Sequence, residues 1–96
     1  PFSVLIAIII TGPNNNHVEK ESIVLANMIK KRFSNITIYG PAPALLNKLR
    51  RNFRWRVLLK INKIDSSRDQ LKIFLSKVTS PSDVNLKIDV DPLTFF

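Results

Sequence analysis

The chain has 96 residues, of which 45% are hydrophobic and 23% are charged, a balance typical of one small globular domain with a single core. It contains no cysteine, which excludes a disulfide framework and a thiolate zinc site and fits a reducing cytoplasm. The formal net charge is +8. This excess favours nucleic acid, an acidic partner or an anionic membrane surface as the binding partner.

The first predicted element is a strand over residues 2–12, FSVLIAIIITG, which is β-branched and almost wholly apolar. The run is too short to span a bilayer, and no basic flank or cleavage site marks it as a signal peptide. An amphipathic helix is predicted over about 17–33, capped by Asn16 with Glu19. Lys30, Lys31 and Arg32 form its last turn, where cations suit the helix dipole.

A short strand is predicted at 35–40, closed by Gly40-Pro41, since the prolines of GPAPAL oppose regular pairing. One short helical turn is expected in LLNKLRRN. The following segment, FRWRVLLKI (53–61), alternates cleanly and is the strongest strand signal in the chain. It places Trp55 with its apolar partners on one face and the cations Arg54, Arg56 and Lys60 on the other.

Ser66 with Asp69 predicts the start of a second helix, which ends before Pro81. Its apolar positions recur at helical spacing: Leu71, Phe74, Leu75 and Val78. A last strand is predicted in VNLKIDVDP, with Asn85, Lys87, Asp89 and Asp91 on one face.

The order strand, helix, strand, strand, helix, strand predicts an α+β fold, the ferredoxin-like βαββαβ split sandwich. In that fold a four-stranded antiparallel sheet carries two helices on one face. The helices should cover the Trp55 face and leave the face with Arg54, Arg56 and Lys60 open. We expect residues 1–96 to form a single domain, and the Pro1 start indicates a domain excised from a longer protein.

No catalytic constellation is present, and His17, at a helix start, reads as an exposed terminal residue. The prolines of GPAPA remove the N–H donors that a phosphate-cradling loop needs. Asp89 and Asp91 share a face, but two carboxylates supply too few ligands for a metal site. We therefore predict no enzyme activity, no metal and no cofactor for this segment.

The basic segment predicts anion binding because no acid occurs between Glu21 and Asp65. The candidate phosphate-binding residues are Lys48, Arg50, Arg51, Arg54, Arg56 and Lys60. The alternative is a solvated face whose long stems pack over the sheet. Modules that stack bases expose several aromatic side chains, and only Tyr39 is a candidate for the open face. Contact with the backbone, without sequence preference, is the expected mode.

Four ordered motifs carry a family resemblance: Gly-Pro-Ala-Pro (40–43), Lys-Leu-Arg (48–50), Arg-Trp-Arg (54–56) and Asp-Val-Asp-Pro (89–92). Together with the PFSVLIAIIITG strand, they resemble the C-terminal domain of primosomal protein N′, the PriA replication-restart helicases. The resemblance covers essentially the whole chain.

The resemblance implies a fragment of a 3′→5′ ATP-dependent DNA helicase that recognises stalled forks and D-loops and initiates primosome assembly. In that family ATP, Mg and Zn are used through upstream regions, so this fragment should not hydrolyse ATP. The domain is expected to bind single-stranded or forked DNA and to contact the helicase lobes. It is also expected to border the site for the acidic tail of single-stranded-DNA-binding protein, at about Arg68 and Lys72.

Two alternatives remain open at the level of sequence. The domain could be a non-catalytic scaffold that braces the helicase lobes and holds one side of a pocket for an acidic peptide. It could also be a free-standing RNA-binding domain similar to a ribosomal protein.

Overall fold

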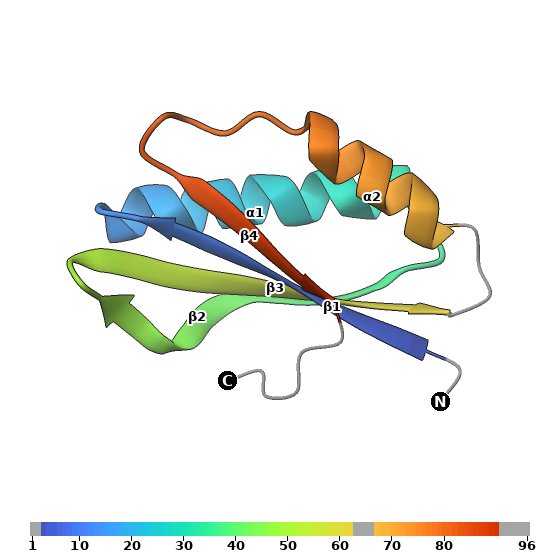
Figure 1. Cartoon of the computed structure of the whole chain (residues 1–96), viewed down its shortest axis with the longest axis horizontal. Helices are drawn as coiled ribbons and strands as arrows, with labels where there is room; N and C mark the ends of the chain where they lie inside the picture. The colour runs from blue at the N-terminus through green and yellow to red at the C-terminus, as the bar shows by residue number, and fades with distance from the viewer. Residues whose placement is uncertain (1–2, 63–66, 91–96) are drawn as a thin grey trace.

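The computed structural model describes residues 3–62 and 67–90, and this part of the chain contains four strands and two helices (Figure 1). In chain order they are β1 (Ser3–Gly12), α1 (Asn15–Arg32), β2 (Thr37–Leu49), β3 (Asn52–Asn62), α2 (Ser67–Lys77) and β4 (Asn85–Val90). The predicted α+β class is confirmed.

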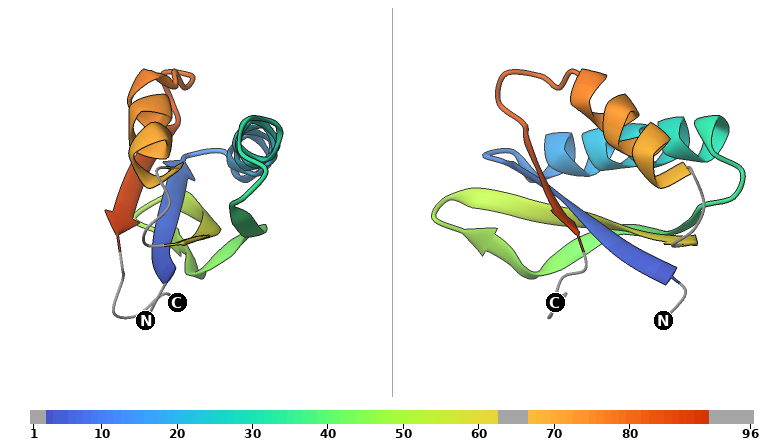
Figure 2. Two further views of the ribbon diagram at one scale, coloured as in Figure 1. Left: turned by 90° about the vertical axis from the view of Figure 1, so that its right-hand side faces the viewer. Right: turned by 45° about the vertical axis from the view of Figure 1, so that its right-hand side comes forward.

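The described strands form one antiparallel sheet in the order β2-β3-β1-β4. The apolar strand β1 lies inside the sheet, where Ile8 is directly opposite Val57 of β3 and Ile88 of β4. Both helices lie on the same side of this sheet, as the turned views show (Figure 2). Within residues 3–62 and 67–90, no helix lies against the other side of the sheet.

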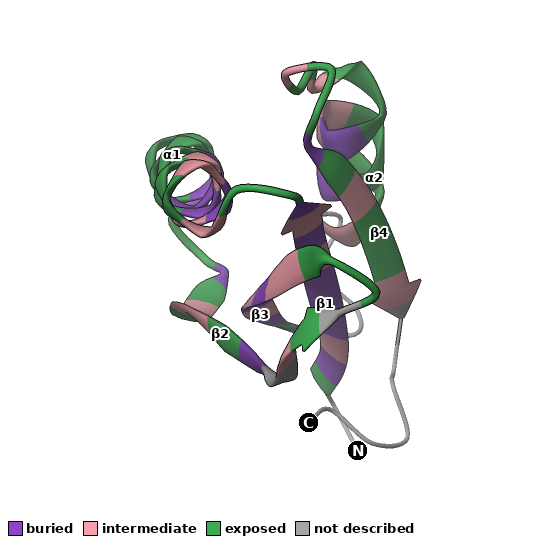
Figure 3. Cartoon of the chain, turned by 90° about the vertical axis from the view of Figure 1, so that its left-hand side faces the viewer, coloured by how far each residue is buried: buried purple, intermediate pink, exposed green. Residues whose placement is uncertain are grey.

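The core lies between the sheet and the helices. Paired positions of β1 and β3 fill its floor: Ile6 is opposite Leu59, Ile8 is opposite Val57, and all four side chains are buried. Figure 3 shows β1 as largely buried, whereas the outer side of α1 is exposed. Successive side chains of a strand point to opposite faces of the sheet. The alternating sequence that predicted β3 therefore matches one face buried in the core and one face turned away from it.

Helix α1 begins two residues earlier than the predicted capping box requires. Its N-cap is Asn14, whose side-chain oxygen accepts a hydrogen bond from the backbone N–H of His17 at 3.0 Å. The prediction of Asn16 as the cap was wrong. Asn15 is the first residue of the helix, and its Oδ1 accepts a hydrogen bond from the indole Nε1 of Trp55 in β3 at 2.9 Å. This contact favours the earlier start of the helix, and the local sequence does not reveal it.

This cap assignment predicts unequal effects for two neighbouring asparagines. Asn14→Ala should lower the free energy of unfolding by about 1 kcal/mol, because it removes the acceptor for an orphan helix N–H. Asn16→Ala, at an exposed position, should stay within about 0.5 kcal/mol of the parent. Urea unfolding followed by circular dichroism compares the two, and a larger loss for Asn16→Ala would refute the assignment.

The predicted periodicity of the second helix is confirmed. Leu71 and Leu75 are buried, Phe74 and Val78 pack against the core, and the rings of Phe74 and Phe33 meet edge to face at 5.8 Å. The predicted cap, Ser66, lies outside the described residues. No helix in residues 3–62 and 67–90 is long and apolar enough to cross a membrane.

Strand β2 is much longer than predicted. It extends from Thr37 through both prolines to Leu49, so the expected helical turn in LLNKLRRN does not form. Gly40, at φ +96°, precedes a cis bond to Pro41, and the pairing with β3 shifts register at Tyr39/Ala42 and again at Pro43/Lys48. The prolines thus interrupt the ladder as bulges rather than ending it.

Candidate nucleic-acid interface

The sheet side away from the helices, here called the open face, carries Arg54, Arg56 and Lys60 from β3. Their neighbours Trp55, Val57 and Leu59 are buried against the helices, so the alternation predicted for this strand is confirmed. Lys60 is exposed, whereas Arg54 and Arg56 are half-buried.

Strand β1 places two apolar residues and one threonine on the open face, opposite these cations. The pairing is Leu5 with Lys60, Ile9 with Arg56, and Thr11 with Arg54. Leu5 and Ile9 are half-buried, although neither described helix lies on this side of the sheet. The cations therefore lie next to apolar side chains, and their charge is kept at the surface of the low-dielectric protein interior.

Strand β4 adds a cation that the sequence did not assign to this site. Lys87 is exposed and lies directly opposite Ile9, which is also opposite Arg56. Arg56 and Lys87 therefore flank one β1 residue from opposite sides. The alternation of β4 indicated the face of Lys87 within its own strand, but only the strand order places it in the same row as Arg56. Asp89, two residues on, lies opposite Ala7 and is the acid of this face in the described part of the chain.

Arg50 and Arg51 form the two-residue turn that joins β2 to β3, at the tip of the hairpin. Both are exposed and both have positive φ, 53° and 68°. This is the type I′ pattern, for which Asn-Gly is the favoured pair. An arginine in this left-handed region costs about 1–2 kcal/mol, so the tip carries two cations at a conformational penalty.

Lys48 does not join the other candidate residues. It is directly opposite Phe53, and its ammonium lies over the Phe53 ring, 5.3 Å from the centroid. Phe53 shares its face with Trp55, so Lys48 projects to the side of the sheet that carries the helices. The bulge between Pro43 and Lys48 shifts the register of β2, so residues after it point to the opposite face from the one that simple alternation would give. Within it, the Asn47 side-chain amide donates to the Arg54 carbonyl at 2.8 Å and so takes the place of a ladder bond.

Arg68 and Lys72, the residues that the family resemblance assigned to partner binding, lie one turn apart on α2. Arg68 is half-buried and Lys72 is exposed. Side chains four residues apart share one face of a helix. Because α2 belongs to the helical layer, this pair is separated by the sheet from Arg54 and Lys60 (Figure 2).

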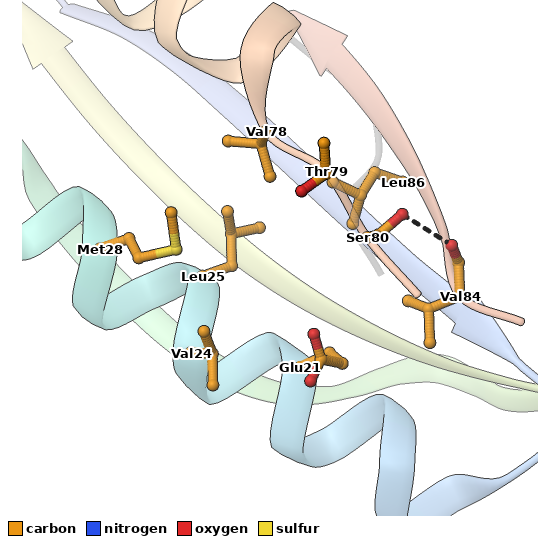
Figure 4. Close-up of a pocket in the computed structure, with 9 residues that line it drawn as sticks. All are labelled: Glu21, Val24, Leu25, Met28, Val78, Thr79, Ser80, Val84 and Leu86. Carbon is orange, nitrogen blue, oxygen red and sulfur yellow. Dashed lines mark hydrogen bonds between the residues drawn. The ribbon is translucent and has the colours of Figure 1, made fainter. Parts of the chain in front are cut away.

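Two further features lie in the helical layer. His17 Nδ1 is 2.9 Å from Asp83 Oδ2, which ties the start of α1 to the segment before β4. A shallow groove opens between α1 and that segment (Figure 4). Its lining includes Val24, Leu25, Met28, Val78 and Leu86, with Glu21 as its charged residue. An apolar groove with an acidic rim is unsuited to phosphate.

The fold and these surfaces define a small basic α+β domain, in which one sheet face carries neither described helix and the hairpin tip is positively charged. The chain belongs to the family described as the primosomal protein N C-terminal domain, whose model matches residues 1–93.

Its curated relatives include the replication restart protein PriA of Rickettsia felis, which is 33% identical over 96 residues covering 100% of this chain and 14% of the relative. The PriA protein of Rickettsia conorii shows the same identity and coverage. The PriA protein of Synechocystis sp. is 32% identical over 99 residues, covering 98% of this chain and 11% of the relative. The chain therefore spans only a small part of the length of the relatives that it matches.

Proposed function

We propose that this chain is the C-terminal domain of a replication-restart DNA helicase and that it contributes contacts to DNA phosphates. The parent would be a cytoplasmic, ATP-dependent 3′→5′ helicase that acts at stalled forks and D-loops and initiates primosome assembly. Its ATP, Mg and Zn would be bound by other regions of that protein. Family membership supports the role in replication restart.

One observation carries the part assigned to this domain: Arg54, Arg56 and Lys60 share the open face, beside a hairpin tip formed by Arg50 and Arg51. Each cation that neutralises a phosphate releases condensed counterions, which is the main driving force of non-specific binding. The contact is electrostatic, so single strands and forks are bound with little sequence preference.

The fold of the domain supports a more specific assignment. We propose the ferredoxin-like split sandwich, because the strand order β2-β3-β1-β4 and the two helices on one side are what two interleaved split βαβ units produce. In this arrangement neither described helix covers the open face, so the described part of the chain leaves it accessible to a ligand.

The test removes two cations from the open face. Arg54→Gln/Lys60→Gln should weaken binding of a single-stranded oligonucleotide about 10-fold or more at low salt. The slope of log affinity against log salt should fall by about 1.4, because each lost single-strand phosphate contact contributes about 0.7. Fluorescence anisotropy titrations at several salt concentrations measure both quantities.

The matched control is Lys30→Gln/Lys31→Gln, which removes the same charge from exposed positions in the last turn of α1. It should leave the salt slope almost unchanged. Equal losses of oligonucleotide affinity in the two double variants would show that net charge alone attracts the DNA. The assignment of the open face as the DNA-binding surface would then be wrong. A preference for structured RNA over forked DNA at matched salt would favour the RNA-binding alternative instead.

A second role is supported by the position of Arg68 and Lys72 on α2, a helix that lies on the side of the sheet opposite the open face (Figure 2). We propose that this pair contributes to docking the acidic tail of single-stranded-DNA-binding protein, near the helicase lobes. Two separate surfaces allow one domain to hold DNA and a protein partner at the same time.

Charge reversal separates the two roles. In the full-length protein, Arg68→Glu should reduce binding of an acidic peptide by at least about 10-fold, because it replaces attraction by repulsion. Oligonucleotide affinity should change less than about twofold. Isothermal titration with each ligand gives the comparison, and parallel losses of both ligands would mean that the surfaces are not distinct.

A further inference from the structure

Tyr39 is an exposed aromatic residue on the open face. It lies directly opposite Leu58 in β3, and Leu58 lies between Arg56 and Lys60 on that face. The preceding residue, Ile38, is opposite Leu59 and packs against the core, so the two neighbours point to opposite sides of the sheet. The Tyr39 side chain is 46% exposed, which is far more than core packing would leave.

The surroundings of Tyr39 combine an apolar row with two cations. Leu58 is next to it across the strand pair, and Ala7 of β1 follows Leu58 in the same row. Arg56 and Lys60 each lie two residues from Leu58 along β3, a separation of about 7 Å in a strand. The ring therefore sits at one end of the row that it forms with Leu58 and Ala7, and a cation lies on either side of Leu58. Asp89 of β4 lies at the other end of this row, beyond Ala7.

This arrangement has the two components of a single-strand binding surface, a π-face for a base and cations for the phosphates on either side of it. A solely apolar partner would cover the exposed Lys60 without supplying a countercharge. Acidic groups could also come from a protein, but an acidic side chain gains little from an exposed ring. The combination favours a nucleotide.

We infer that Tyr39 stacks against a nucleobase of a single strand whose flanking phosphates are held by Arg56 and Lys60. The inference rests on the proposed DNA-binding role of the open face and adds a subsite to it. Stacking tolerates all four bases, since each presents a π-face, so the subsite adds affinity for unpaired nucleotides without sequence preference.

The experiment compares two probes, an oligothymidylate and an abasic oligomer of the same length and charge. The native chain should bind the oligothymidylate about 5- to 100-fold more tightly, the range expected for stacking of one base. Tyr39→Ala should remove most of this difference while leaving the affinity for the abasic oligomer and the salt slope unchanged. Tyr39→Phe should retain the difference because the ring remains.

Ile73→Ala serves as the control, because Ile73 is an exposed apolar residue on α2, in the helical layer. It should bind both probes like the native chain. Equal affinity of the native chain for the two probes would overturn the stacking subsite, whether or not the Tyr39 variants fold. If both probes bind with the expected salt slope in that case, the phosphate-binding role stands. If neither probe binds, the phosphate-binding role itself fails.

Discussion

Replacing Arg50-Arg51 by Asn-Gly should make the domain more stable and, at the same time, a weaker ligand for DNA. The native pair occupies a turn with φ values of 53° and 68°, a conformation that costs an arginine about 1–2 kcal/mol. Asn and Gly adopt it readily. After allowance for the entropy that glycine adds to the unfolded chain, the expected net gain is about 1 kcal/mol, or about 4–8 °C in melting temperature.

The same replacement removes two exposed cations from the hairpin tip. We expect affinity for a single-stranded oligonucleotide to fall about 10-fold at low salt and the salt slope to fall by about 1.4. A higher melting temperature together with a lower DNA affinity would identify the arginines as phosphate ligands, because partial unfolding would lower both quantities. Thermal unfolding by circular dichroism and anisotropy titration of the same preparation provide the two readouts.

The control for this pair is Arg50→Lys/Arg51→Lys, which keeps the charge and the backbone penalty. It should show almost the native melting temperature and salt slope. If Asn-Gly binds DNA as tightly as the native turn, the arginines are not phosphate ligands and the strained turn needs another explanation. Natural proteins retain such strain mainly where function requires the residues.

Trp55→Ala should be the most destabilising of the substitutions considered for this chain. Trp55 is 9% exposed, faces the helices from β3, and its indole Nε1 donates to Asn15 Oδ1 at 2.9 Å. Truncation of a buried Trp costs about 3–5 kcal/mol, a large share of the roughly 5–15 kcal/mol that stabilises a domain of this kind. The melting temperature should fall by about 12 °C or more.

Trp55→Phe separates volume from hydrogen bonding. It keeps an aromatic ring in the core and leaves the Asn15 oxygen to solvent at the helix start, so the expected loss is smaller, about 1–2 kcal/mol. Tyr39→Ala provides the matched exposed case and should change stability by less than about 0.5 kcal/mol. A stable Trp55→Ala protein with weakened DNA binding would reverse the assignment and make Trp55 a binding platform.

Much of the fold could be predicted because the relevant signals are local. The alternation from Phe53 to Ile61 reports which side chains enter the core, and the helical spacing of Leu71, Phe74, Leu75 and Val78 does the same for α2. These periods follow from backbone geometry alone. The faces of Arg54, Arg56 and Lys60 were predictable for the same reason.

The residues that depend on long-range pairing could not be placed in this way. Lys48 was grouped with the arginines because it is near them in sequence, yet the bulge after Pro43 changes the parity of β2 and turns its side chain to Phe53. Asn14 displaced Asn16 as the cap because Asn15 accepts a hydrogen bond from Trp55, 40 residues away. No local pattern contains either constraint.

The sequence by itself therefore determined the family, the α+β class, the apolar core and the cationic face of β3. These rest on motif order and on the 2.0 and 3.6 periods of side-chain direction. Only the tertiary structure decided that Lys87 joins the open face, that Arg50 and Arg51 form a strained tip, and that Tyr39 lies beside Leu58. Strand order and bulges set these neighbours, and both depend on pairing between segments that are distant in the chain.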